Sequence, residues 1–159
     1  MALTKVTGAG IGTVTNQFSD ANMSSGSVLQ VVQTTSTVDS VITTATNFIT
    51  VSITPSSTSN KILIMGVLAS VARRNSTSSE GLYQLLRGDT VINTVDGITP
   101  WNGGATNERS VGSISFNYLD SPSTTSSISY HFRASCTSSG VNINNEGGIS
   151  SLTVMEIVG

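Results

Sequence analysis

The sequence predicts an all-β protein, an antiparallel β-sandwich of the jelly-roll type that follows an extended N-terminal arm. Three observations lead to this fold class. Short apolar and β-branched runs alternate with Ser, Thr, Asn and Gly along most of the chain, and no segment shows helical periodicity. Residues 151–159 form an apolar strand that would tie this end of the chain into a sheet. With 159 residues, 37% of them hydrophobic, the chain can bury one core.

The composition also limits the kinds of binding partner that we expect. Charged residues make up 10% of the chain, against roughly 25% in ordinary domains. Such a surface suits packing against copies of the same chain, because burying charge costs more than burying hydroxyl groups. A net charge of −2 and scattered basic residues argue against nucleic acid. We find neither a secretion signal nor an apolar run long enough for a membrane span, so we expect cytoplasmic synthesis and no membrane insertion.

The chain divides at residue 28. Residues 1–27 are small, polar and rich in Gly, and we expect an arm that orders only against a partner. Residues 28–159 form the predicted sandwich domain, which begins with a strand at 28–33 and a β-branched stretch to about residue 42. In the next strand, alternation places Ile49, Val51 and Ile53 on one face.

Residues 61–71 are the strongest apolar run, and both faces of this strand are apolar. One face carries Ile62, Ile64 and Leu68. The other face, which we take as the candidate subunit interface, carries Leu63, Met65, Val67 and Val71. A strand that is apolar on both faces must be covered on both. The core would cover one face, and a neighbouring subunit would cover the other.

The remaining strands complete a jelly roll of eight or nine strands. Residues 81–87 and 90–95 flank Gly88-Asp89 and predict a hairpin. Its turn spells Arg87-Gly88-Asp89, the tripeptide of cell-adhesion ligands, but we interpret it as a tight turn that requires Gly. Further strands are expected at 111–119, 127–135, 140–145 and 149–158. Alternation places Ile114, Phe116 and Tyr118 on one face of their strand. It places Ile128, Tyr130, Phe132 and Ala134 on the core face of theirs.

The residues that perform catalysis are scarce. The chain has one histidine, His131, on the polar face of a strand, and one cysteine, Cys136, without an activating neighbour. Asp120 and Glu156 lie in separate strands, and nothing in the sequence pairs them. The amides and carboxylate of residues 142–146 fit a turn better than a metal site. We therefore expect a protein that is not an enzyme and carries no cofactor or metal.

One loop has the chemistry of a binding surface. It combines an aromatic ring, amides and cations, which suits recognition of a sugar or a protein. The candidate residues are Arg73, Arg74, Trp101, Asn102, Asn107 and Arg109. The alternative for Trp101 is a ring packed over the end of the sandwich.

Several segments resemble small virion appendage proteins of tailed bacteriophages, the heads of tail fibres or capsid fibres. The opening Met1-Ala-Leu-Thr-Lys-Val6 is one of them. The others are Val28-Leu-Gln-Val-Val-Gln33, Ser52-Ile-Thr-Pro-Ser-Ser-Thr-Ser-Asn-Lys-Ile-Leu-Ile64, Leu85-Leu-Arg-Gly-Asp-Thr-Val-Ile92, Tyr118-Leu-Asp-Ser-Pro122 and Leu152-Thr-Val-Met-Glu-Ile157. Their order and spacing cover most of the chain from residue 28.

The resemblance implies a trimeric jelly roll similar to the C1q/TNF type and a structural role in the virion, as a fibre or capsid-decoration head. It implies that the arm, with Leu3, Lys5, Val6 and Ile11, docks to other virion proteins, while the head is free to contact a host-surface glycan or protein. A stand-alone lectin-like or adhesin module is the alternative function, and a depolymerase is a third that lacks an acid pair.

Overall fold

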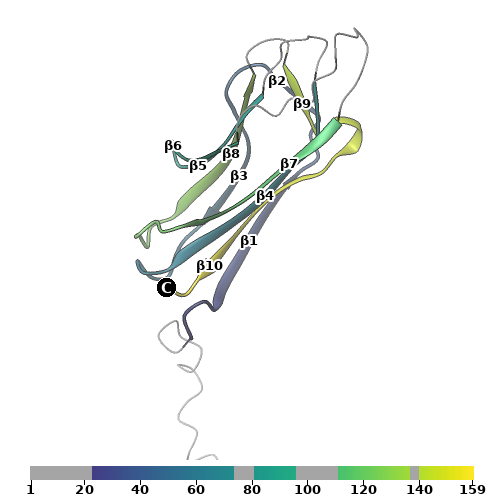
Figure 1. Ribbon diagram of the computed structural model, residues 1–159. Helices are drawn as coiled ribbons and strands as arrows, with labels where there is room; N and C mark the ends of the chain where they lie inside the picture. Colours follow the sequence, from purple (N-terminus) through teal and green to yellow (C-terminus); the bar gives the residue numbers. More distant parts are fainter. Residues whose placement is uncertain (1–22, 74–80, 96–110, 137–139) are drawn as a thin grey trace, which may run out of the picture.

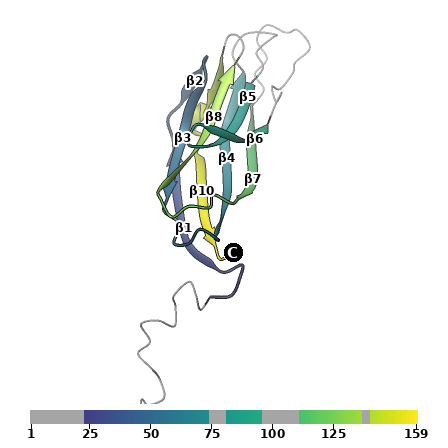
Figure 2. The ribbon, with the colours of Figure 1, turned by 90° about the vertical axis from the view of Figure 1, so that its left-hand side faces the viewer.

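The protein is a sandwich of two antiparallel sheets, seen edge-on in Figure 1 and with sheet B in front of sheet A in Figure 2. The computed structural model describes residues 23–73, 81–95, 111–136 and 140–159. Sheet A contains β1 (Val28–Ser36), β10 (Ser150–Ile157), β4 (Lys61–Arg73), β7 (Val111–Asp120), β9 (Val141–Ile143) and β2 (Ser40–Ile42). Sheet B contains β3 (Thr46–Ile53), β8 (Ile128–Cys136), β5 (Gly81–Arg87) and β6 (Thr90–Val95). A short 3₁₀ turn, η3 (Asn145–Gly147), precedes β10.

The strand order confirms the predicted jelly roll. Apart from the short strands β2 and β9, sheet A runs β1-β10-β4-β7 and sheet B runs β3-β8-β5-β6. Numbered along the chain without those two, the orders are 1-8-3-6 and 2-7-4-5, the arrangement of two Greek keys wrapped into one sandwich. The last strand is tied into a sheet, as predicted, and its neighbours are β1 and β4.

The core lies between the sheets and follows the predicted alternation. Ile49, Val51 and Ile53 of β3 are buried, as are alternate residues of β8 from Ile128 to Ala134. Phe116 of β7 meets Phe132 of β8 edge-on, with ring centroids 4.4 Å apart. These contacts join the two sheets, and the apolar side chains of the inner faces are buried between them.

A β-bulge in β4 corrects one prediction. The register with β7 shifts between Leu68 and Val71, and Ser70 adopts a φ of 47°. Because the bulge adds a residue, alternation changes parity beyond it. Val71 therefore lies in the core, 4% exposed, and not on the outer face with Leu63, Met65 and Val67. Strict alternation in the sequence could not reveal this change.

A network of hydrogen bonds among buried polar groups stabilises the bulge. The backbone N–H of Ala69 donates to the hydroxyl of Ser150, and the N–H of Asn144 donates to the carbonyl of Ala69. The hydroxyl of Ser150 donates in turn to the Asn144 side chain at 2.6 Å, and the Asn144 amide donates to the carbonyl of Ser36. These bonds place β9 and β10 one after the other along the same edge of β4, as the strand pairing shows.

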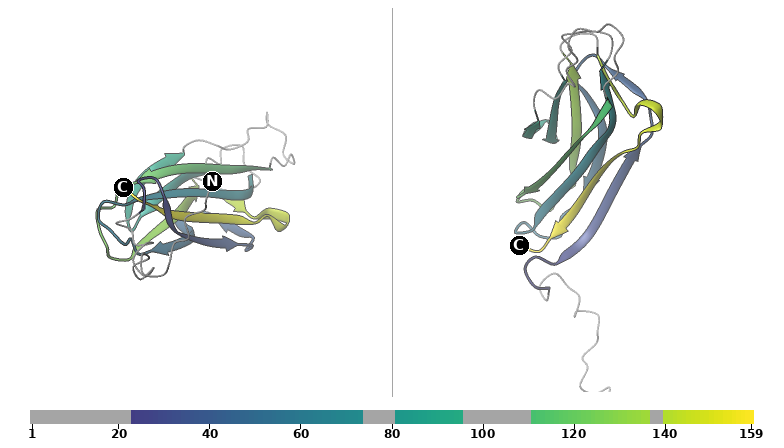
Figure 3. Two further views of the ribbon diagram at one scale, coloured as in Figure 1. Left: turned by 90° about the horizontal axis from the view of Figure 1, so that it is seen from below. Right: turned by 45° about the vertical axis from the view of Figure 1, so that its right-hand side comes forward.

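The sandwich has two ends, which we call the base and the tip (Figure 1 and Figure 3). The base holds the first residue of β1, the last residues of β10, the 88–89 turn and the connections 54–60 and 121–127. At the tip, β4, β6 and β8 end and β5 and β7 begin. At the base, residues 26 and 27 precede β1 and form backbone hydrogen bonds with Val158.

Candidate functional site

An apolar row crosses the outer face of sheet A near the base. Strand pairing aligns Val31 of β1 with Met155 of β10, Met155 with Leu63 of β4, and Leu63 with Leu119 of β7. Val31 and Leu119 are 55% and 51% exposed, and Met155 and Leu63 are half-buried between them. We call these four residues the apolar row. Since the core already covers the inner face, the row is not needed to complete the sandwich.

The next two rows toward the tip are mainly polar. The first aligns Gln33, Thr153, Met65 and Asn117, and the second aligns Thr35, Ser151, Val67 and Ser115. A shallow hollow lies in these rows, lined by Met65, Gly66, Ser115, Phe116, Asn117, Ser151 and Thr153. The amide of Gln33 donates to the hydroxyl of Thr153 at 2.8 Å. The outer face of sheet A thus changes from apolar at the base to hydroxyl-rich toward the tip, and none of these three rows contains a charged residue.

The outer face of sheet B has a different chemistry. Thr50 and His131 share a hydrogen bond of 2.8 Å, and Ser52 and Ser129 share one of 2.9 Å. The guanidinium of Arg133 donates twice to the Gln84 carbonyl oxygen, at 2.6 and 3.1 Å. These polar side chains bond to one another across the strands, which is typical of a face exposed to water.

Glu156, at the base, is a buried carboxylate that accepts four hydrogen bonds. Ser56 donates its N–H and its hydroxyl to one carboxylate oxygen, and Asn60 donates to the same oxygen at 2.8 Å. Gln30 donates to the other oxygen at 2.6 Å. Burial alone would raise the pKa of Glu156, but the bonds from Asn60, Gln30 and Ser56 outweigh it and hold the pKa below its ordinary value. The carboxylate therefore ties β1 and the 54–60 connection to β10.

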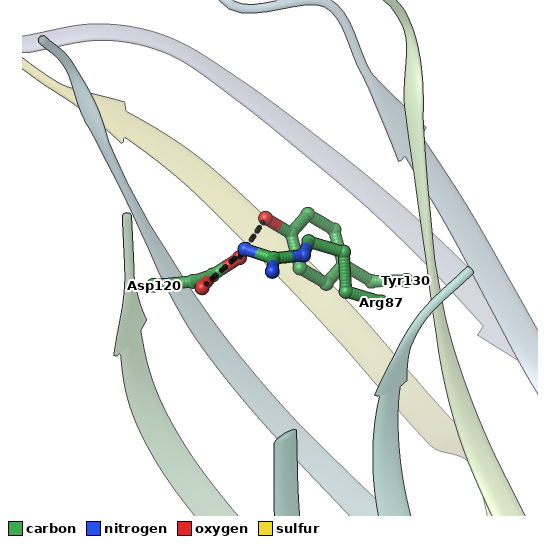
Figure 4. Close-up of polar contacts among 3 residues, drawn as sticks. All are labelled: Arg87, Asp120 and Tyr130. Atoms are coloured by element: carbon green, nitrogen blue, oxygen red, sulfur yellow. Dashed lines mark hydrogen bonds and ion pairs between the residues drawn. The ribbon is translucent and has the colours of Figure 1, made fainter. Parts of the chain in front are cut away.

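Asp120 is the second buried carboxylate, and it connects the two sheets (Figure 4). Arg87 of β5 donates to both of its oxygens, at 2.9 and 3.0 Å, and the hydroxyl of Tyr130 of β8 donates at 2.7 Å. Burial, together with the bond to Asp120, raises the pKa of Tyr130 well above its ordinary value. Tyr130 thus remains a neutral donor, and the cluster fastens β7 of sheet A to sheet B.

The two carboxylates lie on either side of Ile62, which pairs with Glu156 on one edge and with Asp120 on the other. Nothing in the sequence pairs these two carboxylates, and the strand order places them beside the same residue of β4. Neither is free to act on a substrate, because Glu156 is 1% exposed and Asp120 is 6% exposed and both are fully bonded to protein groups. Their role in this geometry is structural.

The other sequence-predicted sites have different outcomes. Leu63, Met65 and Val67 share the outer face of sheet A, as alternation predicted. The arm residues Leu3, Lys5, Val6 and Ile11, and the loop residues Arg74, Trp101, Asn102, Asn107 and Arg109, lie outside the described residues. Arg73 ends β4 at the tip. The hairpin at Gly88-Asp89 is confirmed, and Arg87 of the adhesion-like tripeptide is bonded to Asp120.

Sequence reasoning missed Val31, Met155 and Leu119, which complete the apolar row. Each lies in a strand whose alternation was visible, but only the register places them beside Leu63. Within the described residues, no group of three or more His, Cys, Asp or Glu side chains could hold a metal ion. The described part of the chain also contains no helix that could span a membrane.

Comparisons with known proteins give only a partial likeness in fold. No family model matches the chain, and no curated protein matches it. A structure of infectious bursal disease virus, Gt strain, is 17% identical with a TM-score of 0.43, over 86% of this chain and 34% of that chain. The VP2 subviral particle of the same virus is 13% identical with a TM-score of 0.38, over 81% of this chain and 38% of that chain. The chain thus spans little more than a third of these proteins, and similarity at this level does not extend to function.

Proposed function

We propose that this protein is a structural component of a tailed-phage virion, a trimeric fibre or capsid-decoration head. The observation that carries the proposal is the exposed apolar row on the outer face of sheet A, beside two rows that contain no charged residue, on a sandwich whose core is already complete. An apolar surface of this kind on a small domain indicates an interface. The resemblance of the sequence to phage appendage proteins supplies the class of assembly.

The arrangement of the two ends supports a division of roles. The described chain enters at the base, next to the apolar row, so an arm that docks to the particle would leave the head there. The strands that flank residues 74–80 and 96–110 end at the opposite pole. A head attached by its base would therefore present its tip, where the strands that flank these two segments end or begin, away from the particle and toward a host glycan or protein.

The first test is the absolute mass of the full-length protein, measured by light scattering behind a sizing column. We expect about three times 16.4 kDa. A monomer at all concentrations would contradict the proposal. The second test is detection of the protein on purified virions by mass spectrometry and gold labelling. A protein found only in lysate, never on particles, would refute the virion role even if it is trimeric.

The arm is tested by deleting residues 2–22, which leaves every described residue in place. We expect the truncated head to keep its mass in solution but to lose its attachment to particles. A truncated head that still decorates particles would assign attachment to the sandwich itself. The matched control replaces residues 2–22 by a Gly/Ser segment of equal length, which should behave like the deletion.

A further inference from the structure

The apolar row and the polar rows above it lie on the same face, and this division defines how a partner would contact it. The row crosses four strands without interruption, from Val31 to Leu119. The rows toward the tip add amide and hydroxyl groups around a hollow that reaches Gly66 and Phe116. A partner seated on this face would meet a dry band at the base and a zone toward the tip that can hold water.

The absence of charge from these rows favours a second copy of this chain as the partner. In a symmetric assembly, residues near the axis meet their own copies, so a charged side chain there would face a like charge in a dry contact. None of the residues in the three rows is charged, and Lys61 lies beyond them, in register with Ile157 at the edge of the base. A different protein would more often be recognised through complementary charges.

The size of the face sets a further condition. Four strands about 4.8 Å apart, with nine residues of about 3.3 Å each, give a face of roughly 550 Å² in projection. A stable interface buries about 800 Å² of accessible surface on each partner, which is more than the flat projection of this whole face. Four apolar side chains alone are too few, so the contact must include the hydroxyl rows as well as the apolar row.

We propose that a second copy of this chain covers the outer face of sheet A, with a dry contact at the apolar row and a hydrated contact over the hollow. The inference rests on the proposed function only for the number of copies. It predicts a gradient: a charge introduced in the apolar row meets a dry surface, whereas a charge introduced beside the hollow stays hydrated. Val67, in the row farthest from the base, is therefore less critical than Leu63.

The experiment measures the mass of four single variants over a range of concentrations. Leu119→Asp and Leu63→Asp should raise the dissociation constant at least 100-fold, because the new carboxylate would be buried without a partner. Val67→Asp should raise it by no more than about 10-fold. Ser52→Asp, on the outer face of sheet B, is the matched control and should leave it unchanged. Circular dichroism and thermal melting establish that each variant is folded.

A conservative variant separates contact from folding. Leu119 is half exposed, so Leu119→Met should fold and keep the assembly, while Leu119→Asp should fold as a monomer. The inference is overturned if both row variants remain assembled, if Ser52→Asp dissociates as they do, or if Val67→Asp is as damaging as Leu63→Asp. Absence of the wild-type assembly from virions would refute the proposed function and leave this inference standing.

Discussion

The outer faces of sheets A and B differ in the chemistry of their side chains. On sheet B, polar side chains pair with one another across strands, as Thr50 does with His131 and Gln84 with Arg133. On sheet A, the apolar row crosses four strands near the base. Both sheets cover the same core, so folding does not require their outer faces to differ in polarity. The apolar row of sheet A therefore has no counterpart among the cross-strand polar pairs of sheet B.

The largest loss of stability is expected from disrupting the Asp120 cluster, which connects the two sheets. Asp120→Ala would leave Arg87 without its ion pair and Tyr130 with a buried, unpaired hydroxyl. Because Arg87 is partly exposed, we expect a loss of about 2–4 kcal/mol in the free energy of unfolding. Urea denaturation measures it. A loss below about 0.5 kcal/mol would show that the sheets do not depend on this cluster.

The second prediction concerns the base of sheet A, and it tests whether the two sheets lose stability independently. Glu156→Gln replaces an acceptor of four hydrogen bonds by an amide that cannot accept all of them, and we expect a loss of about 1–3 kcal/mol near neutral pH. Hydrogen exchange should increase in β1 and in residues 54–60, while the strands of sheet B remain protected. Equal loss of protection in both sheets would contradict this local role.

The same residue predicts a pH dependence. The pKa of Glu156 is lower in the folded state than in the unfolded chain, so its stabilising contribution is complete above the ordinary carboxyl pKa and is lost as the pH falls through the folded value. The wild type should lose stability from about pH 4.3 downward. The difference between wild type and Glu156→Gln should shrink over the same range. A constant difference from pH 7 to pH 2 would rule out the ionised carboxylate as its source.

A similar effect is expected at the centre of sheet A. A Cβ at Gly66 would lie 2.9 Å from the Phe116 ring and 3.2 Å from Leu152. Gly66→Ala should therefore displace Phe116 from its contact with Phe132 and cost about 1–3 kcal/mol. Thermal melting measures the cost. The matched control is Gly112→Ala, where a Cβ meets nothing within 4 Å and stability should change little.

The smallest effect belongs to the outer face of sheet B. Ser52→Ala and Ser129→Ala each remove one partner of an exposed hydrogen bond. We expect single changes of no more than about 0.5 kcal/mol and an unchanged mass in solution. A double-mutant cycle measures the coupling between them. Dissociation of the assembly by either substitution would mean that sheet B, and not sheet A, forms the interface.

Local patterns in the sequence were sufficient for the fold but only partly for the site. Alternation in residues 49–53 and 128–134 identified inward-facing side chains correctly, since a strand sets this period within itself. It failed at Val71, where a bulge changed the parity. The apolar row and the Asp120 cluster depend on the register between strands distant in sequence. Arg87 and Asp120 are 33 residues apart, and Ser56 and Glu156 are 100 apart.

The pairing of β1 with β10 has a mechanical consequence. The two strands are antiparallel over nearly the whole length of β1, from Val28 opposite Ile157 to Ser36 opposite Ser150. A tether pulling at the base end of β1, with the tip held fast, would act along the strands and load their hydrogen bonds together in shear. Bonds loaded together resist force far better than bonds that open one after another. A head anchored in this way would withstand tension along its long axis better than a sideways pull that peels β1 from the edge of the sheet.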